Sequence, residues 1–209
     1  MFKGRKEAAL KLAKKLEGKI PLKNTLVLSL ARGGVVVGRI IATYFNLPLD
    51  VLVFKKIGDP RNNELALGVV GPKNTIVWND DILRFSNLSR KQESVRQLAS
   101  QKERERQEQE KLLRKGKQKI NLKNKTIILV DDGIATGATV LCAQKYLQKE
   151  KVKSIILAVP VVASDTLRNI KEYFDRVIFL KKTLHFFAVG QFYRYFPQVT
   201  SEEVVNLLK

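Results

Sequence analysis

The sequence is poor in cysteine and histidine, with one residue of each among 209. Cys142 alone cannot form an intramolecular disulfide, and one cysteine with one histidine cannot complete an ordinary zinc site. No stretch approaches the roughly 18 unbroken apolar residues of a membrane span. Residues 1–15, MFKGRKEAALKLAKK, also lack the apolar centre of a signal peptide. We therefore expect a cytoplasmic protein with no membrane segment, disulfide framework or structural zinc.

Acidic residues are scarce beside basic ones. The chain has 39 lysines and arginines against 20 aspartates and glutamates, a net charge of +19. This surplus exceeds what solubility requires and predicts a surface that attracts phosphorylated or polyanionic partners, without saying which polyanion. The 209 residues, 44% of them hydrophobic, are enough for one sizeable core, so we expect a single domain over residues 1–209.

Helical and strand-like patterns alternate along most of the chain, which predicts an α/β fold with a mostly parallel sheet and helices on both faces. Strands separated by helical patterns are typical of such sheets. The expected helices cover residues 5–16, 35–44, 138–148 and 164–173, and the expected β-rich runs cover 26–30, 49–58, 64–79, 125–130, 154–162 and 176–180.

Residues 84–120 interrupt this pattern with a charged excursion that has few apolar side chains. Ser89 with Gln92 has the spacing of a capping box, and Glu110 with Arg114 has the spacing of a favourable helical ion pair. These features predict a solvated helix that is mobile if it is anchored only at its ends. The usual reason for such a run is simply a solvated face.

Fourteen residues, IILVDDGIATGATV at 127–140, bring an apolar strand, two adjacent aspartates and a loop rich in glycine and threonine together. Such a loop lies at the carboxyl edge of a parallel sheet, where α/β folds bind ligands. Small residues, hydroxyls and a helix amino terminus favour a phosphate. Asp131 and Asp132 suit sugar hydroxyls, or a magnesium ion held partly through water. A phosphorylated sugar satisfies both halves, whereas the Walker A and G-x-G-x-x-G spacings are absent.

The segment ILVDDGIATGAT resembles the phosphoribosyl pyrophosphate (PRPP) motif of type I phosphoribosyltransferases. SLARGGVVVG is similar to the pyrophosphate loop of that family, and FAVGQFY is similar to its tail. The order of these pieces, from about residue 5 to 205, looks closest to a bacterial subgroup whose substrate is unassigned. The resemblance implies the type I fold, with a charged lid at 84–120 and a C-terminal aromatic hood with a final helix at 181–209.

The resemblance also assigns roles to individual residues. Asp131 and Asp132 would hold the ribose hydroxyls, and any metal contact through them would pass through ribose or water. Arg32 would add charge to a pyrophosphate loop that includes Ala31, Gly33 and Gly34. Lys55 and Lys56 would neutralise the leaving group unless they are surface lysines. The 5′-phosphate would be wrapped by Gly133, Ala135, Thr136, Gly137, Ala138 and Thr139, and Arg114, Lys115 and Lys117 would clamp pyrophosphate.

The implied reaction moves the phosphoribosyl group of PRPP to a nucleobase or similar nitrogen acceptor, with release of pyrophosphate, help from Mg²⁺ and a role in nucleotide salvage. Hypoxanthine-guanine enzymes carry an aspartate where this chain has Ala135, which makes a 6-oxopurine a less expected acceptor. Phe186 or Phe187 would stack on the nucleobase, unless this aromatic tail only packs in the core. Glu64 is a candidate general base that would accept a proton. Dimers are common in the family, and the oligomeric state stays open.

A second hypothesis is a regulator that binds PRPP or a nucleotide in the same pocket but does not catalyse the transfer. Some members of this fold are nucleotide-sensing regulators that bind RNA or DNA, and a net charge of +19 would serve that purpose. The sequence carries no other nucleic-acid motif, so nonspecific contact with nucleic acid is all that the charge predicts.

Overall fold

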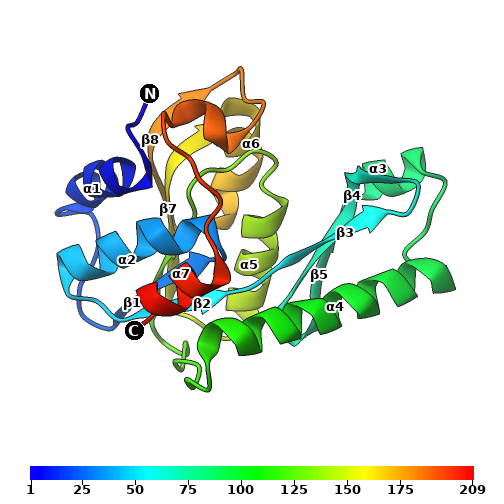
Figure 1. The fold of residues 1–209 in the computed structure, drawn as a ribbon, viewed down its shortest axis with the longest axis horizontal. Coiled ribbons are helices and arrows are strands. Elements are labelled where there is room, and N and C mark those ends of the chain that lie inside the picture. Colours follow the sequence, from blue (N-terminus) through cyan, green and yellow to red (C-terminus); the bar gives the residue numbers. More distant parts are fainter.

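The computed structural model describes residues 1–62 and 65–209 in full. Glu64, the candidate base, therefore lies outside the described residues. Five parallel strands form the central sheet in the order β2-β1-β6-β7-β8 (Figure 1). Their bounds are Thr25–Leu30 for β1, Leu49–Leu52 for β2, Thr126–Val130 for β6, Ser154–Ala163 for β7 and Arg176–Thr183 for β8. The predicted α/β class and parallel sheet are confirmed.

Helices cover both faces of this sheet. Side chains such as Val27 and Ile128 face the first two helices, while their strand neighbours Leu28 and Leu129 face the other side, because successive residues of a strand point to opposite faces. Burial on both faces explains why these strands read as continuous apolar runs. The helices are α1, Arg5–Leu16, and α2, Gly33–Phe45, on one face, and α5, Ala138–Lys149, and α6, Ser164–Ile170, on the other.

A second, antiparallel sheet extends away from the central one (Figure 1). It consists of β3, Lys55–Asp59, β4, Asn62–Gly71, and β5, Thr75–Trp78, with a 3₁₀ turn, η1, at Pro72–Asn74. Two helices complete this arm, α3 at Asp80–Phe85 and α4 at Glu93–Arg114. The β-rich run expected at 49–58 therefore divides between two sheets, and we call residues 55–114 the arm.

Helix α4 does not lie free in solvent, so the prediction of a solvated helix is wrong along one of its faces. Val95 and Ala99 are buried with apolar side chains of the arm sheet. Further along the same face, Arg106 is 3% exposed and bonds Glu103 at 2.7 Å and Glu110 at 2.9 Å. Charged residues that are paired can be buried, which is why the sequence composition alone suggests exposure.

The C-terminal part returns across the carboxyl edge of the central sheet. Strand β8 is preceded, at the opposite edge, by a 3₁₀ turn, η2, at Lys171–Tyr173. After β8, another 3₁₀ turn, η3, at Val189–Phe192 leads to the last helix, α7, at Ser201–Leu207. Thr200 and Glu203 form a capping box at the start of this helix, with bonds of 2.7 and 3.1 Å. Cys142 is fully buried, and burial raises the pKa of its thiol to about 12. Among the described residues, no helix has both the length and the apolarity to cross a membrane.

Candidate functional site

Two loops that follow neighbouring strands form the candidate site. Strands β1 and β6 pair in parallel, with Ser29 opposite Val130, so both chains leave the sheet at the same edge. Residues 31–34 follow β1, and residues 131–139 follow β6 and lead into α5. The peptide bond between Ala31 and Arg32 is cis. The predicted pyrophosphate loop and PRPP motif are therefore neighbours in space.

Asp132 is held by an arginine from the start of the chain. The Nε of Arg5 donates to Oδ2 of Asp132 at 2.8 Å, and its Nη1 donates to the carbonyl of Pro197 at 2.8 Å. The guanidinium carbon also lies 3.6 Å from the ring centre of Phe196, within cation–π range. Since Arg5 is 9% exposed and Asp132 is 8% exposed, this ion pair is largely removed from water. It fixes the orientation of one carboxylate of the predicted pair.

Gly33 allows the two loops to approach each other. A Cβ added at this position would lie 1.9 Å from Oδ2 of Asp132, a distance that no side chain can adopt. The glycine is therefore required by the close approach of the first loop to the carboxylate. Arg32, at the start of α2, is half-buried, and its guanidinium makes no hydrogen bond or ion pair with the described residues, so this group is available to an anion.

Asp131 has no comparable counter-charge within the part of the chain that the structure describes. Its Oδ1 accepts a hydrogen bond from the backbone N–H of Asp132 at 2.9 Å. Burial, and then the charge of Asp132, hold the pKa of Asp131 well above its usual range. Burial also raises the pKa of Asp132, although the bond and charge of Arg5 oppose that rise. One carboxylate is thus neutralised within the protein, while the other is left for a ligand.

The loop after the two aspartates is shaped to receive an anion. Gly137 has φ +78°, a left-handed conformation that favours glycine, and caps the start of α5. Ile134 is fixed to β7 by two backbone bonds of 3.0 Å, and the Thr166 hydroxyl donates to the carbonyl of Ala135. These contacts hold the loop, so its N–H groups and the helix amino terminus form a fixed positive end.

A cavity of about 240 Å³ opens at this loop. Its wall includes both carboxylates, and Val189 closes it on the side of the C-terminal segment. Of the residues predicted to bind PRPP, those that line it are Lys56, Asp131, Asp132, Gly133, Ala135, Thr136, Gly137 and Thr139. Ala138 instead lines an adjoining cavity of about 250 Å³, which also contains Lys56 and Thr136.

The two adjacent lysines of β3, Lys55 and Lys56, point to opposite faces of the strand. Lys56 lines both cavities, whereas Lys55 lines neither of them. Alternation along a strand places Lys55 on the same face as Ile57, whose side chain is fully buried beside α4. Only Lys56 therefore keeps the position that a contact with the leaving group would need.

The predicted base-stacking residues differ from each other. Phe186 is partly buried, with its ring centre 4.9 Å from that of Phe192, whereas Phe187 is 88% exposed. Neither lines the cavity beside the aspartates. His185, the one histidine of the sequence, is exposed. A stacking role for either phenylalanine stays a prediction.

The predicted pyrophosphate clamp is wrong for Arg114, whereas the roles of Lys115, which caps the end of α4, and of Lys117 stay predictions. Arg114 is buried and bonds Asp50 at 2.8 Å and the carbonyl of Val51 at 2.9 Å, so its charge is already used. Lys117 donates to the carbonyl of Leu208 at 2.8 Å. These residues join α4 to β2 and α7, away from the cavity at the aspartates.

Several residues of the site could not be found from the motif. Arg5 lies 127 positions before Asp132, within a helix whose pattern indicates only core packing. The hydroxyl of Tyr193 donates to the backbone carbonyl of Asp132 at 2.6 Å, and burial raises the pKa of this tyrosine. The aromatic tail was the one available signal, and it did not indicate which ring contacts the motif.

Known proteins resemble this chain over its whole length. A Mycobacterium tuberculosis H37Rv protein provisionally named a phosphoribosyl transferase is 37% identical over 209 residues, all of this chain, and its counterpart in strain CDC 1551 matches equally. The alignment takes in 46% of those proteins, so this chain spans about half their length.

Solved structures agree on the fold. The crystal structure of TT1426 from Thermus thermophilus matches with a TM-score of 0.81 and 32% identity, over 99% of this chain and 97% of that one. A purine phosphoribosyltransferase from Pyrococcus horikoshii Ot3 matches with a TM-score of 0.52 and 17% identity over 94% and 89%, which supports the fold alone. The family model for the phosphoribosyl transferase domain matches residues 3–196, and this chain therefore belongs to the phosphoribosyl transferase family.

Proposed function

We propose that the protein transfers the phosphoribosyl group of PRPP to a nitrogen of an acceptor base and releases pyrophosphate. The observation that carries this proposal is the cavity of about 240 Å³, where a carboxylate with no ion-pair partner among the described residues adjoins an amide-rich loop at a helix amino terminus. One end of the cavity suits hydroxyl groups and the other suits a phosphate, as a ribose 5-phosphate requires.

The residues would contribute mainly through position and charge. Asp131 and Asp132 would accept hydrogen bonds from the ribose hydroxyls, while residues 135–139 hold the 5′-phosphate. Arg32, whose guanidinium has no partner among the described residues, and Lys56 would offset the charge that develops on the departing pyrophosphate. Fixed groups of this kind favour the transition state because they need little rearrangement during the reaction.

The side chains of the site are compatible with a Mg²⁺ ion that is also held by water or by the substrate. Among the described residues there is no group of three or more histidine, cysteine or acidic side chains that could hold a metal by themselves. Magnesium commonly binds one or two carboxylates together with water and substrate phosphates. Asp131 and Asp132 would hold it through ribose or water, and the ion would supply positive charge near the pyrophosphate.

The acceptor is expected to be a base other than a 6-oxopurine, because Ala135 offers no carboxylate to accept a proton from it. The direct experiment incubates the protein with PRPP, Mg²⁺ and a panel of nucleobases and follows pyrophosphate release. Release that depends on one base supports the transferase. A protein that neither binds PRPP nor releases pyrophosphate with any base would contradict it.

The two lysines of β3 provide a matched test of PRPP binding. In the wild type, PRPP with Mg²⁺ at ~100 times the dissociation constant should stabilise the fold by about 2.7 kcal/mol. We expect Lys56→Met to reduce this gain and Lys55→Met to preserve it, because both remove one positive charge but only Lys56 lines the cavity. Thermal unfolding with and without ligand measures the gain. Equal responses of the two variants would show that Lys56 does not contact the ligand.

The charge of +19 keeps a nucleic-acid-binding regulator as a second candidate. We expect contacts with nucleic acid to be nonspecific, to weaken by ~10³-fold or more between about 50 and 200 mM salt if six phosphates are engaged, and to ignore PRPP. Titrations against random and genomic RNA and DNA at two salt concentrations, with and without PRPP and Mg²⁺, test this. A sequence-selective complex that survives high salt and responds to PRPP would favour the regulator instead.

A further inference from the structure

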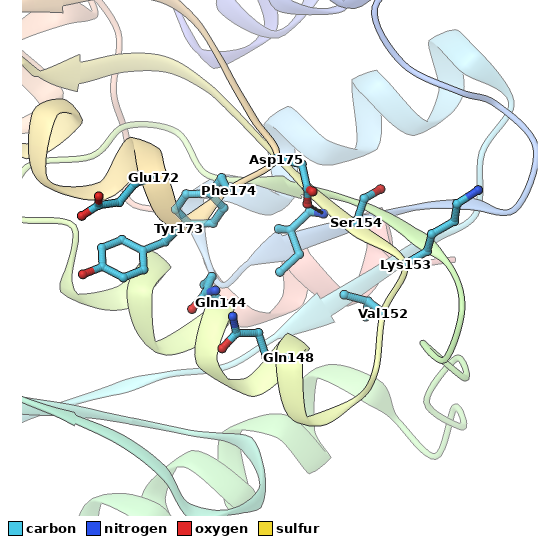
Figure 2. Close-up of a pocket in the computed structure, with 10 residues that line it drawn as sticks. Gln144, Gln148, Val152, Lys153, Ser154, Glu172, Tyr173, Phe174 and Asp175 are labelled. Atoms are coloured by element: carbon cyan, nitrogen blue, oxygen red, sulfur yellow. Dashed lines mark hydrogen bonds between the residues drawn. The ribbon is translucent and has the colours of Figure 1, made fainter.

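A second cavity lies at the other edge of the central sheet. It has a volume of about 630 Å³ and is formed where α5 ends and where β7 and β8 begin (Figure 2). The aspartates of the candidate site follow the carboxyl end of β6, so the two cavities lie at opposite ends of the parallel strands. We call this second cavity the amino-edge pocket. Its lining comprises residues 144, 148, 152–155 and 172–175.

Gln144 gives this pocket a polar group that has no protein partner among the described residues. The residue is only 6% exposed, yet its side-chain amide makes no hydrogen bond with any of the described residues. It projects from α5 among the lining residues of the pocket (Figure 2). Buried amides in folded proteins almost always have a partner, because leaving one unpaired costs free energy. The amide of Gln144 is not among the fully buried unpaired polar groups of the described residues, so it faces the open space of the pocket, where water or a ligand can pair with it.

The surrounding side chains suit a flat polar molecule. Gln148 lies one helical turn after Gln144 and presents a second, exposed amide. Opposite α5, the segment around η2 carries Tyr173, which is 48% exposed, and Phe174, which is 7% exposed (Figure 2). Two amides beside a partly exposed aromatic ring can bind the edge and the face of a planar ring at the same time.

The charges of the pocket argue against a polyanion. Glu172 and Asp175 contribute two carboxylates, and Lys153 contributes one ammonium group. One oxygen of Asp175 already accepts the backbone N–H of Ile155 at 2.7 Å. The charged side chains that line the pocket are therefore acidic on balance, although the whole protein carries +19, so they do not favour a phosphate.

We propose that the amino-edge pocket binds an uncharged nucleobase or nucleoside. The amide of Gln144 donates to and accepts from adjacent groups on the edge of the base, a pairing for which glutamine has the required geometry. Tyr173 covers the face of the base. This binding does not depend on the transferase reaction, because no residue of the pocket belongs to the cavity at Asp131.

Ligand-observed NMR and calorimetry with adenine, hypoxanthine, uracil, cytosine and their nucleosides test the proposal on the whole chain without PRPP. We expect at least one of them to bind, and Gln144→Leu to weaken that binding about tenfold or more. Leucine has nearly the volume of glutamine, and no described residue bonds the amide of Gln144, so the variant should keep the fold of the wild type. Tyr173→Ala, at an exposed position, should weaken binding as well.

Two controls separate this pocket from other sources of binding. Gln118→Leu makes the same substitution at an exposed glutamine elsewhere and should bind like the wild type. Lys56→Met alters the cavity at the aspartates and should also leave the affinity unchanged. Absence of binding across the panel, equal affinity in wild type and Gln144→Leu, or loss in Lys56→Met alone would overturn the proposal.

Discussion

The Arg5→Met variant should lose about 3–5 kcal/mol of its free energy of unfolding at neutral pH, because it leaves the carboxylate of Asp132 buried without its partner. It also removes a guanidinium that lies 3.6 Å from the ring centre of Phe196 and bonds Pro197 at 2.8 Å. Stabilisation by PRPP should disappear with it, since Arg5 fixes the orientation of Asp132 through a bond of 2.8 Å. Urea unfolding at pH 7, with and without PRPP and Mg²⁺, measures both effects.

Lys6→Met is the matched control for this change. Lys6 is exposed on the same helix, one residue away, and its substitution removes the same charge, so we expect an effect within about 0.5 kcal/mol. Adding Asp132→Asn to Arg5→Met should restore part of the lost stability, because the second change removes the stranded charge. If Arg5→Met behaves like Lys6→Met, the ion pair has no structural role.

The local parts of the fold are the ones that the sequence predicts well. Apolar periodicity locates α1, predicted at 5–16 and observed at Arg5–Leu16, because a helix face depends only on nearby residues. Apolar periodicity could not predict that residues 49–58 divide between two sheets. This division depends on the antiparallel pairing of β3 with β4, in which Lys55 lies opposite Val70, and a strand pattern does not name its partner.

The charged helix shows a second limit. The composition of α4 indicates solvent exposure. However, Arg114 forms an ion pair with Asp50, which lies 64 positions earlier in strand β2 of the central sheet, and Glu110 forms an ion pair with Lys119 at 2.9 Å. Charges on one helix can be read from the sequence, whereas the partners that allow their burial come from elsewhere in the fold.

The candidate site combines both situations. The motif is continuous, so Asp131, Asp132 and the loop to Thr139 are predicted together, and all of them except Ala138 line one cavity. The residues that set their electrostatics are remote. Arg5 forms an ion pair with Asp132, whereas Asp131 has no ion-pair partner among the described residues. Two adjacent aspartates in a sequence give no sign of this difference.

That asymmetry implies a conflict between stability and binding at Asp131. We expect Asp131→Asn to raise the free energy of unfolding of the free protein at pH 7.5 by about 0.5–2 kcal/mol, as is common when a functional group is held at a cost to the fold. The amide keeps the shape and can still accept the N–H of Asp132, now 2.9 Å from Oδ1. The same variant should lose most of the stabilisation by PRPP, because charge-assisted bonds to the ribose are gone.

The pH dependence gives this prediction its sign. Burial and the charge of Asp132 raise the pKa of Asp131 in the folded state, so the native protein binds a proton more tightly than the unfolded chain does. Stability of the wild type therefore falls as pH rises from the unfolded value of about 3.9 through the raised folded value. Asparagine does not titrate, so the advantage of the variant should be large at pH 7.5 and small near pH 4, as urea unfolding at the two pH values would measure. Asp165→Asn, at a side chain 70% exposed, should show no such trend. A variant less stable than the wild type at pH 7.5 would mean that Asp131 is already compensated in the free protein, and the argument for an anionic group reserved for the ligand would fail.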